Sequence, residues 1–125
     1  MKLWKLDYVG ETFKNWHGGM LSFVAQRITG LVLVLYLFLH LWSLSSILAG
    51  GGSFKDAMMA YETPLFRVGE WLLLVAVLFH MLNGLRIIVA DWFGLTRLQR
   101  GMFWVAAVAT VAICGASIPF FILWR

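Results

Sequence analysis

The chain has 125 residues, of which 62% are hydrophobic and only 13% carry a formal charge. Three stretches are long and apolar enough to cross the roughly 30 Å of hydrocarbon in a bilayer, which takes about 20 helical residues. This composition excludes an ordinary soluble domain, and the length predicts a single membrane domain over residues 1–125. The net charge of +4 suits an anionic membrane surface and predicts no nucleic-acid partner.

The N-terminal segment, residues 1–20, is polar and aromatic and has no apolar stretch of the kind found in a cleavable signal peptide. Its lysines and aromatic residues are typical of the headgroup region of a bilayer. Positive charges gather before and at the start of the first apolar stretch, and at the end of the second stretch and in the loop that follows it. This predicts that the N-terminus and that loop lie on the cytoplasmic side. These charges are Lys2, Lys5, Lys14, Arg27, Arg86, Arg97 and Arg100.

The first predicted span covers residues 22–49 and carries one polar stripe. Its members recur at seven, seven, four and three residues, which places them on one helix face; they are Ser22, Thr29, Tyr36, His40 and Ser43. Lipid does not favour such a stripe, so it should face other helices or a bound group. His40 lies well inside the bilayer. It is either an interhelical hydrogen-bonding residue or a ligand to a metal or cofactor.

Glycines at positions 50–52 end this span, and we expect residues 54–64 to form a polar spacer loop. The second predicted span, residues 65–92, contains His80, Gly84, Arg86 and Asp91. At about 100° per residue, His80, Gly84 and Asp91 share a face, with Gly84 clearing space one turn from the histidine, while Arg86 projects about 120° away. The Arg86 side chain either reaches up to the headgroups or serves a bound group. Asp91 is either a surface carboxylate at a helix end or part of a site.

The third predicted span covers residues 101–124 and contains no residue that we expect to bind a ligand or take part in a reaction. Small residues form a face suited to close packing with a neighbouring helix; they are Ala106, Ala109, Ala112, Gly115 and Ala116. Cys114 is the only cysteine, so no intrachain disulfide forms and we expect it to be a packing residue. The predicted fold class is an all-α membrane protein with three transmembrane helices.

Haem ligation is the chemistry that these residues favour. A proton relay needs more deep titratable groups than His40 and His80, a transporter site needs broken helices and repeats, and an ion pore needs rings of polar residues. Haem needs an axial imidazole, a cleared helix face and a cation near its propionates. His80 with Gly84 offers the first two, and Arg27 or Arg86 offers the third.

Two motifs resemble those of the cytochrome b subunit of succinate dehydrogenase (complex II). They are Arg27-Ile28-Thr29-Gly30 at the start of the first span and His80-(x)3-Gly84-x-Arg86-(x)4-Asp91 in the second. The resemblance covers the whole chain in length, layout and orientation. The family pattern has a histidine at the positions of Gln26 and Ile87, and a serine at Phe23 where this chain has Ser22 one residue earlier.

The resemblance implies that His80 is an axial ligand of haem b, that Arg27 and Ser22 lie at a quinone site, and that Arg86 and Asp91 close its cytoplasmic end. It implies a second haem if His40 is also a ligand. The chain would be half of a heterodimeric helix-bundle anchor in the inner (cytoplasmic) membrane. Its partners would be a second membrane anchor subunit, an iron–sulfur subunit and a flavoprotein subunit. The alternatives are a fumarate reductase anchor and a haem-free scaffold or transporter component.

Overall fold

A computed structural model describes residues 18–123, which are almost entirely helical. In chain order the elements are α2 (Gly18–Ser45), the 3₁₀ helix η1 (Ser46–Ala49), α3 (Gly51–Tyr61), α4 (Pro64–Trp92), the 3₁₀ helix η2 (Thr96–Leu98) and α5 (Gln99–Leu123). Three of them are long and apolar enough to cross a membrane: α2 with η1, α4, and η2 with α5. The predicted all-α class and its three spans are therefore confirmed.

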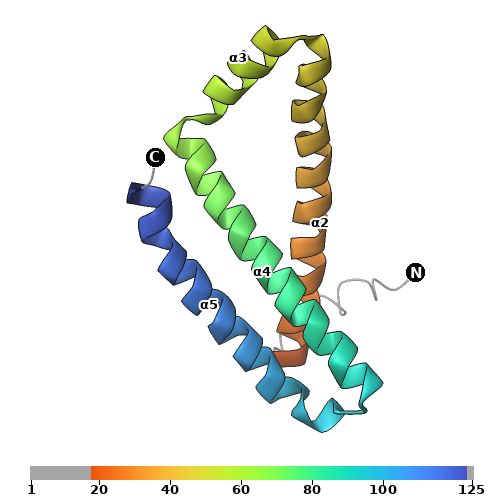
Figure 1. Cartoon of the computed structure of the whole chain (residues 1–125). Helices are drawn as coiled ribbons and strands as arrows, with labels where there is room; N and C mark the ends of the chain where they lie inside the picture. The colour runs from red at the N-terminus through yellow and green to blue at the C-terminus, as the bar shows by residue number, and fades with distance from the viewer. Residues whose placement is uncertain (1–17, 124–125) are drawn as a thin grey trace, which may run out of the picture.

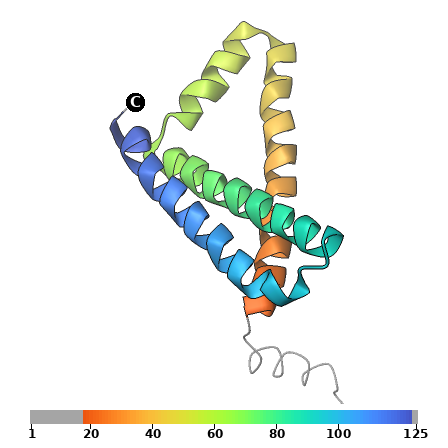
Figure 2. The same ribbon diagram turned by 60° about the horizontal axis from the view of Figure 1, so that its bottom comes forward.

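The helices form an open triangle (Figure 1). α4 and α5 run antiparallel along one side, α2 crosses α4 near the start of α2 and the end of α4, and the two then diverge. α3 closes the triangle between the far ends of α2 and α4, as a second view also shows (Figure 2). The start of α2, the end of α4 and the start of α5 therefore meet at one end of the molecule.

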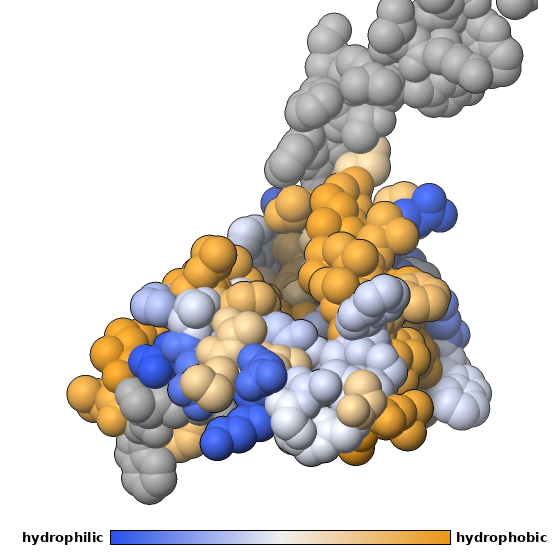
Figure 3. Space-filling view, turned by 90° about the horizontal axis from the view of Figure 1, so that it is seen from above, coloured by the Kyte–Doolittle hydropathy of each residue, from blue (hydrophilic) through white to orange (hydrophobic). Residues whose placement is uncertain are grey.

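The predicted spacer loop at residues 54–64 is wrong, because Gly51–Tyr61 forms α3. Gly50, at φ 109°, turns the chain out of η1, and the alanine and methionines that follow are good helix formers. The hydroxyl groups of Tyr61 and Ser43 form a hydrogen bond that ties α3 back to α2. Seen from the end that carries α3, this face mixes the two kinds of residue, with hydrophilic ones in the lower middle and at the right edge, and hydrophobic ones in the upper middle and at the left (Figure 3). This pattern suits a helix lying in the membrane interface.

The small core of the chain lies mainly between α4 and α5. Ala76 and Ala90 of α4 are buried there, as are four residues of α5 spaced by three, four and four: Phe103, Ala106, Thr110 and Cys114. The Phe79 ring meets the Phe103 ring edge to face, with the centroids 6.4 Å apart. Cys114 is thus a packing residue, as predicted.

The predicted small-residue face of the third span is not the face that packs within the chain. Only Ala106 of that set is buried, and Ala112, Gly115 and Ala116 are exposed. The reason is that α5 turns its Phe103–Cys114 stripe, which includes a bulky ring, toward α4. Likewise, the most apolar 18-residue window of the first span contains no buried residue. Much apolar surface of the described helices is therefore left for lipid or for other subunits.

Candidate functional site

A buried polar network joins the three helices where they meet. The Ser22 hydroxyl donates to Asn83 Oδ1 at 2.9 Å and accepts from Arg86 Nη2 at 2.8 Å. Asn83 Nδ2 donates to Gln26 Oε1 at 2.9 Å, and Arg86 Nη1 donates to the Gln99 carbonyl at 2.8 Å. Ser22 and Asn83 are 1% and 0% exposed, so these bonds satisfy groups that would otherwise be costly inside a membrane protein.

The Arg86 side chain turns inward and is held by groups of the other two spanning helices. The residue is only 9% exposed, and its guanidinium lies 5.9 Å from the centroid of the Phe103 ring. Its Nε atom is buried and has no hydrogen-bond partner among the described residues. Inward rotation is favoured because Ser22 and the Gln99 carbonyl supply acceptors at the crossing of the helices.

Asn83 is the centre of this network and was not among the predicted site residues. Its amide also lies 3.4 Å from the Ser22 carbonyl, so it bridges side chain and backbone of α2. The sequence feature that could have identified Asn83 is its polar carboxamide within an apolar span, at about −60° from His80 around the helix. Such a residue usually bonds to a neighbouring helix.

His80 lies half-buried against α2, on a different side of α4 from Arg86. Its Nδ1 atom is 3.0 Å from Thr29 Oγ1, and a Cβ atom at Gly30 would lie only 3.2 Å from the imidazole Cε1. Gly30 therefore lets the Cε1 side of the ring approach the α2 backbone closely. Thr29 was recognised only as a member of the polar stripe and the motif, and its contact with His80 was not predicted.

The hydrogen bonds of Thr29 favour one tautomer of His80. The Thr29 hydroxyl has one hydrogen, which it donates to the Ala25 carbonyl at 2.7 Å, with the Gln26 carbonyl at 3.1 Å as the other acceptor. With its hydrogen on the Ala25 carbonyl, the Thr29 oxygen accepts, which matches the tautomer of His80 that has its proton on Nδ1. The Nε2 lone pair is left available for a ligand.

The space beside Gly84 is not open, contrary to the prediction that this glycine clears room for a cofactor. A Cβ atom there would lie 3.1 Å from Gln26 Nε2. That nitrogen donates to the His80 carbonyl at 3.2 Å. Gly84 therefore permits the close approach of Gln26, the residue that stands where the family pattern has a histidine.

The other predicted site residues are not part of this cluster. Arg27 is exposed, and its guanidinium stacks 4.5 Å from the centroid of Phe23. Asp91 is exposed and has no hydrogen bond or ion pair within residues 18–123. His40 is exposed, and its Nδ1 lies 3.3 Å from the Tyr36 hydroxyl. The structure thus brings Ser22, Arg86 and His80 close to the α2–α4 crossing and leaves the other three on the surface.

The residues around His80 fit one axial position of a haem. Nε2 has no hydrogen-bond partner among the described residues and is not among their buried unpaired atoms, so it reaches the surface of the chain. Within the same residues no group of three or more histidines, cysteines and carboxylates could hold a bare metal ion. A haem iron could be held by an imidazole without such a group of ligands.

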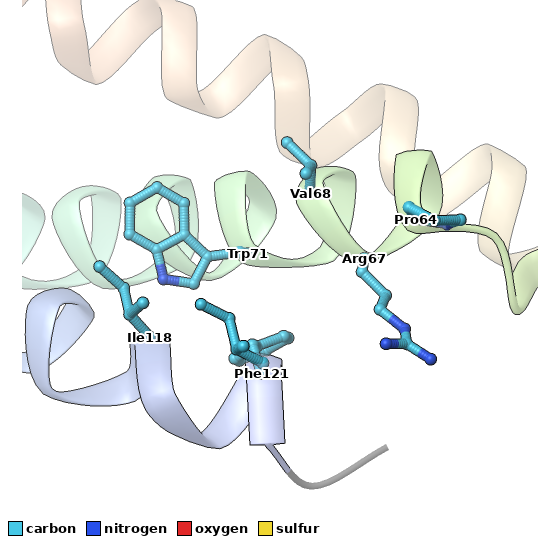
Figure 4. Close-up of a pocket in the computed structure, with 7 residues that line it drawn as sticks. Pro64, Arg67, Val68, Trp71, Ile118 and Phe121 are labelled. Carbon is cyan, nitrogen blue, oxygen red and sulfur yellow. The ribbon is translucent and has the colours of Figure 1, made fainter.

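The larger groove in the described part of the chain lies at the opposite end, between the start of α4 and the end of α5 (Figure 4). It measures about 420 Å³, and most of the side chains that line it are apolar. The lining also includes the charged Arg67 and the indole of Trp71. The Trp71 indole donates to the Cys114 carbonyl at 3.3 Å and to Ser117 Oγ at 3.2 Å. None of the predicted site residues lines this groove, so it is separate from the candidate site.

Comparison with known proteins gives a family match over residues 11–117, to the succinate dehydrogenase/fumarate reductase transmembrane subunit. The chain is 36% identical over 88 residues to the succinate dehydrogenase 2 membrane subunit SdhC of Mycobacterium tuberculosis, covering 70% of this chain and 65% of that protein. It is 35% identical over 105 residues to the succinate dehydrogenase hydrophobic membrane anchor subunit of Halobacterium salinarum, covering 83% of this chain and 81% of that protein.

Proposed function

Since the chain belongs to the succinate dehydrogenase/fumarate reductase transmembrane subunit family, we propose that it binds haem b through His80 and helps to form the quinone site of a succinate:quinone oxidoreductase. The membrane-anchor role follows from the family and from the three apolar helices. What we propose beyond that role is the binding of haem, the contact with quinone and the parts played by individual residues.

One observation carries the haem proposal, which is the pairing of Thr29 with Nδ1 of His80 at 3.0 Å. Histidines that ligate a metal usually donate their other ring N–H to a protein acceptor, which fixes the tautomer and the ring orientation. Here Thr29 supplies that acceptor and Gly30 supports the ring. When bound, a haem would supply a one-electron redox centre beside the quinone site.

For the quinone, Arg27 is the stronger of the two predicted contacts. Its guanidinium is exposed and has no hydrogen bond within residues 18–123, so it is available to a quinone oxygen. The hydroxyl of Ser22 already donates to Asn83 and accepts from Arg86. A quinone contact with Ser22 would have to replace one of these bonds, so we assign Ser22 mainly to holding Arg86. Asp91 would lie at the same end of α4 as a surface carboxylate.

The proposed path begins with oxidation of succinate on a flavoprotein subunit. Electrons would pass through an iron–sulfur subunit to the quinone near Arg27. A second membrane anchor subunit would supply the other axial ligand and cover exposed apolar surface of α2 and α5. We propose the inner (cytoplasmic) membrane as the location, with the N-terminus on the cytoplasmic side and residues 1–125 as one domain. A fumarate reductase anchor would use the same arrangement in the reverse direction.

The test is a reduced-minus-oxidised spectrum of the purified complex, with the haem-to-complex ratio measured beside it. We expect a b-type α-band that is lost in His80→Ala, while the complex still assembles. An assembled wild-type complex with no such band would support the haem-free scaffold instead. An Arg27→Ala complex that reduces quinone at the normal rate would remove Arg27 from the site.

A further inference from the structure

A second hollow, which unlike the apolar groove is polar, lies on the α5 side of the helix crossing. Its lining is strongly basic. It measures about 240 Å³ and is lined by Gly18, Gly19, Arg86, Thr96, Arg97, Gln99 and Arg100. Three of these seven residues are arginines and none is acidic. Within residues 18–123, no carboxylate forms an ion pair with any of the three arginines. The hollow therefore has the chemistry of an anion site.

Arg86 lines this hollow and has no acidic partner among residues 18–123. It is nine-tenths buried, and its two Nη groups donate only to neutral oxygens, those of Ser22 and Gln99. A buried guanidinium without a counter-ion is costly in a membrane protein. An anion held near Arg86 by Arg97 and Arg100 would offset that cost.

The depth of the hollow matches that of a lipid phosphate. The Arg86 backbone lies about 9 Å before Trp92 along the axis of α4, and its guanidinium ends at the Gln99 carbonyl at the start of α5. Trp92 and Phe93 are 83% and 72% exposed, as expected for aromatic residues at the membrane–water boundary. Arg97 and Arg100 follow in the short connection and the first turn of α5, so their charges lie at headgroup level.

The surface next to the hollow favours a lipid over a soluble anion or an acidic protein segment. Trp104 and Val108 stand four and eight residues after Arg100, so they continue along the same face of α5. They are 55% and 64% exposed, and they form an apolar strip that leads from the arginine toward the bilayer centre. A cationic hollow joined to an apolar strip complements a molecule with an anionic head and hydrocarbon chains.

We propose that this hollow binds the phosphate of an anionic phospholipid, with an acyl chain lying along Trp104 and Val108. Basic pockets between transmembrane helices are known to hold such headgroups. The site is separate from His80, because Arg86 lies about 120° around α4 from it. It does not depend on the haem or quinone proposal.

The test measures lipid retained by the purified complex that contains this subunit, using native mass spectrometry. The complex is offered phosphatidylglycerol and phosphatidylcholine with the same acyl chains. We expect wild type to retain phosphatidylglycerol preferentially, and Arg97→Gln with Arg100→Gln to lose that preference by roughly fivefold for each arginine. Arg67→Gln, which removes a cation at the opposite end, should retain it.

Equal retention of the two lipids by wild type, or an unchanged preference in the double variant, would overturn the proposal. So would thermal stabilisation of wild type by inorganic phosphate equal to that by phosphatidylglycerol, since the site would then take a free anion. If the glutamine variants do not assemble, Arg97→Lys with Arg100→Lys keeps the charge and should keep the preference; its loss would contradict the proposal.

Discussion

Nδ1 of His80 lies 3.0 Å from the hydroxyl oxygen of Thr29, whose own hydrogen is directed to the Ala25 carbonyl 2.7 Å away. The two residues are 51 positions apart, so the bond links α2 to α4 as well as fixing the imidazole. It leaves Nε2 as the only ring nitrogen of His80 that can bind a ligand.

Replacing Thr29 with valine removes this acceptor while keeping the side-chain shape. Loss of a hydrogen-bonded partner behind a metal-binding histidine typically weakens metal affinity by about 10- to 100-fold. We expect Thr29→Val to reduce the haem content of the purified complex and to shift the midpoint potential of the haem that remains. Thr29→Ser keeps the hydroxyl and should resemble wild type. Matching potentials in Thr29→Val and wild type would mean that Thr29 is only a packing residue.

Two glycines on facing helices give a matched pair of substitutions. In Gly30→Ala the new methyl group would lie 3.2 Å from the His80 ring, and in Gly84→Ala it would lie 3.1 Å from the end of the Gln26 side chain. The ring cannot move without losing its bond to Thr29, and the Gln26 amide cannot move without losing its bonds to Asn83 and the His80 carbonyl. Only the ring, however, is the proposed haem ligand. We therefore expect Gly30→Ala to change the haem spectrum more than Gly84→Ala does. A larger spectral change in Gly84→Ala would place the haem on the Gln26 side instead.

The network around Asn83 predicts that replacing this residue lowers the stability of the complex. Asn83→Ala leaves the Ser22 hydroxyl hydrogen and the Gln26 Oε1 atom without the partner they have in the network, and each unsatisfied group costs about 1–3 kcal/mol. Hydrogen bonds between membrane helices average only about 0.6 kcal/mol, so we expect a total loss of roughly 1–3 kcal/mol. Thermal inactivation of the detergent-solubilised complex measures it. Ser45→Ala removes only an exposed bond to the Trp42 carbonyl and serves as the control. Equal midpoints for the two variants would contradict a structural role of Asn83.

The three spans could be predicted from the sequence because length and hydropathy decide which helices cross a bilayer. Helix α3 could not, because a mixed polar segment after glycines gives the same composition for an interfacial helix and for a loop. Its placement depends on tertiary contacts such as the one between Tyr61 and Ser43. The same limit applies to α5, where several small residues could have faced α4 and the structure uses Ala106 but not Ala112.

The site was predictable to the extent that it depends on position along one helix. The motifs and the helical spacing identified His80 and Arg86 as special positions. Their partners come from other helices, so the contact of His80 with Thr29 and that of Arg86 with the Gln99 carbonyl depended on how the helices cross. The inward turn of Arg86 depended on acceptors more than 12 residues away in the chain, which no pattern within α4 could reveal.

His40 has a hydroxyl beside Nδ1, as His80 does, but this hydroxyl is not engaged with a backbone carbonyl among residues 18–123. The Tyr36 hydroxyl lies 3.3 Å from Nδ1 of His40 and has no other hydrogen-bond partner within residues 18–123. Its hydrogen is therefore free to be donated to Nδ1, which places the histidine proton on Nε2 and makes that nitrogen a donor. We predict that His40 is not a haem ligand and that His40→Ala leaves the haem-to-complex ratio at one. A fall in that ratio from two in wild type to one in His40→Ala, with the His80 haem signal retained, would establish the two-haem arrangement instead.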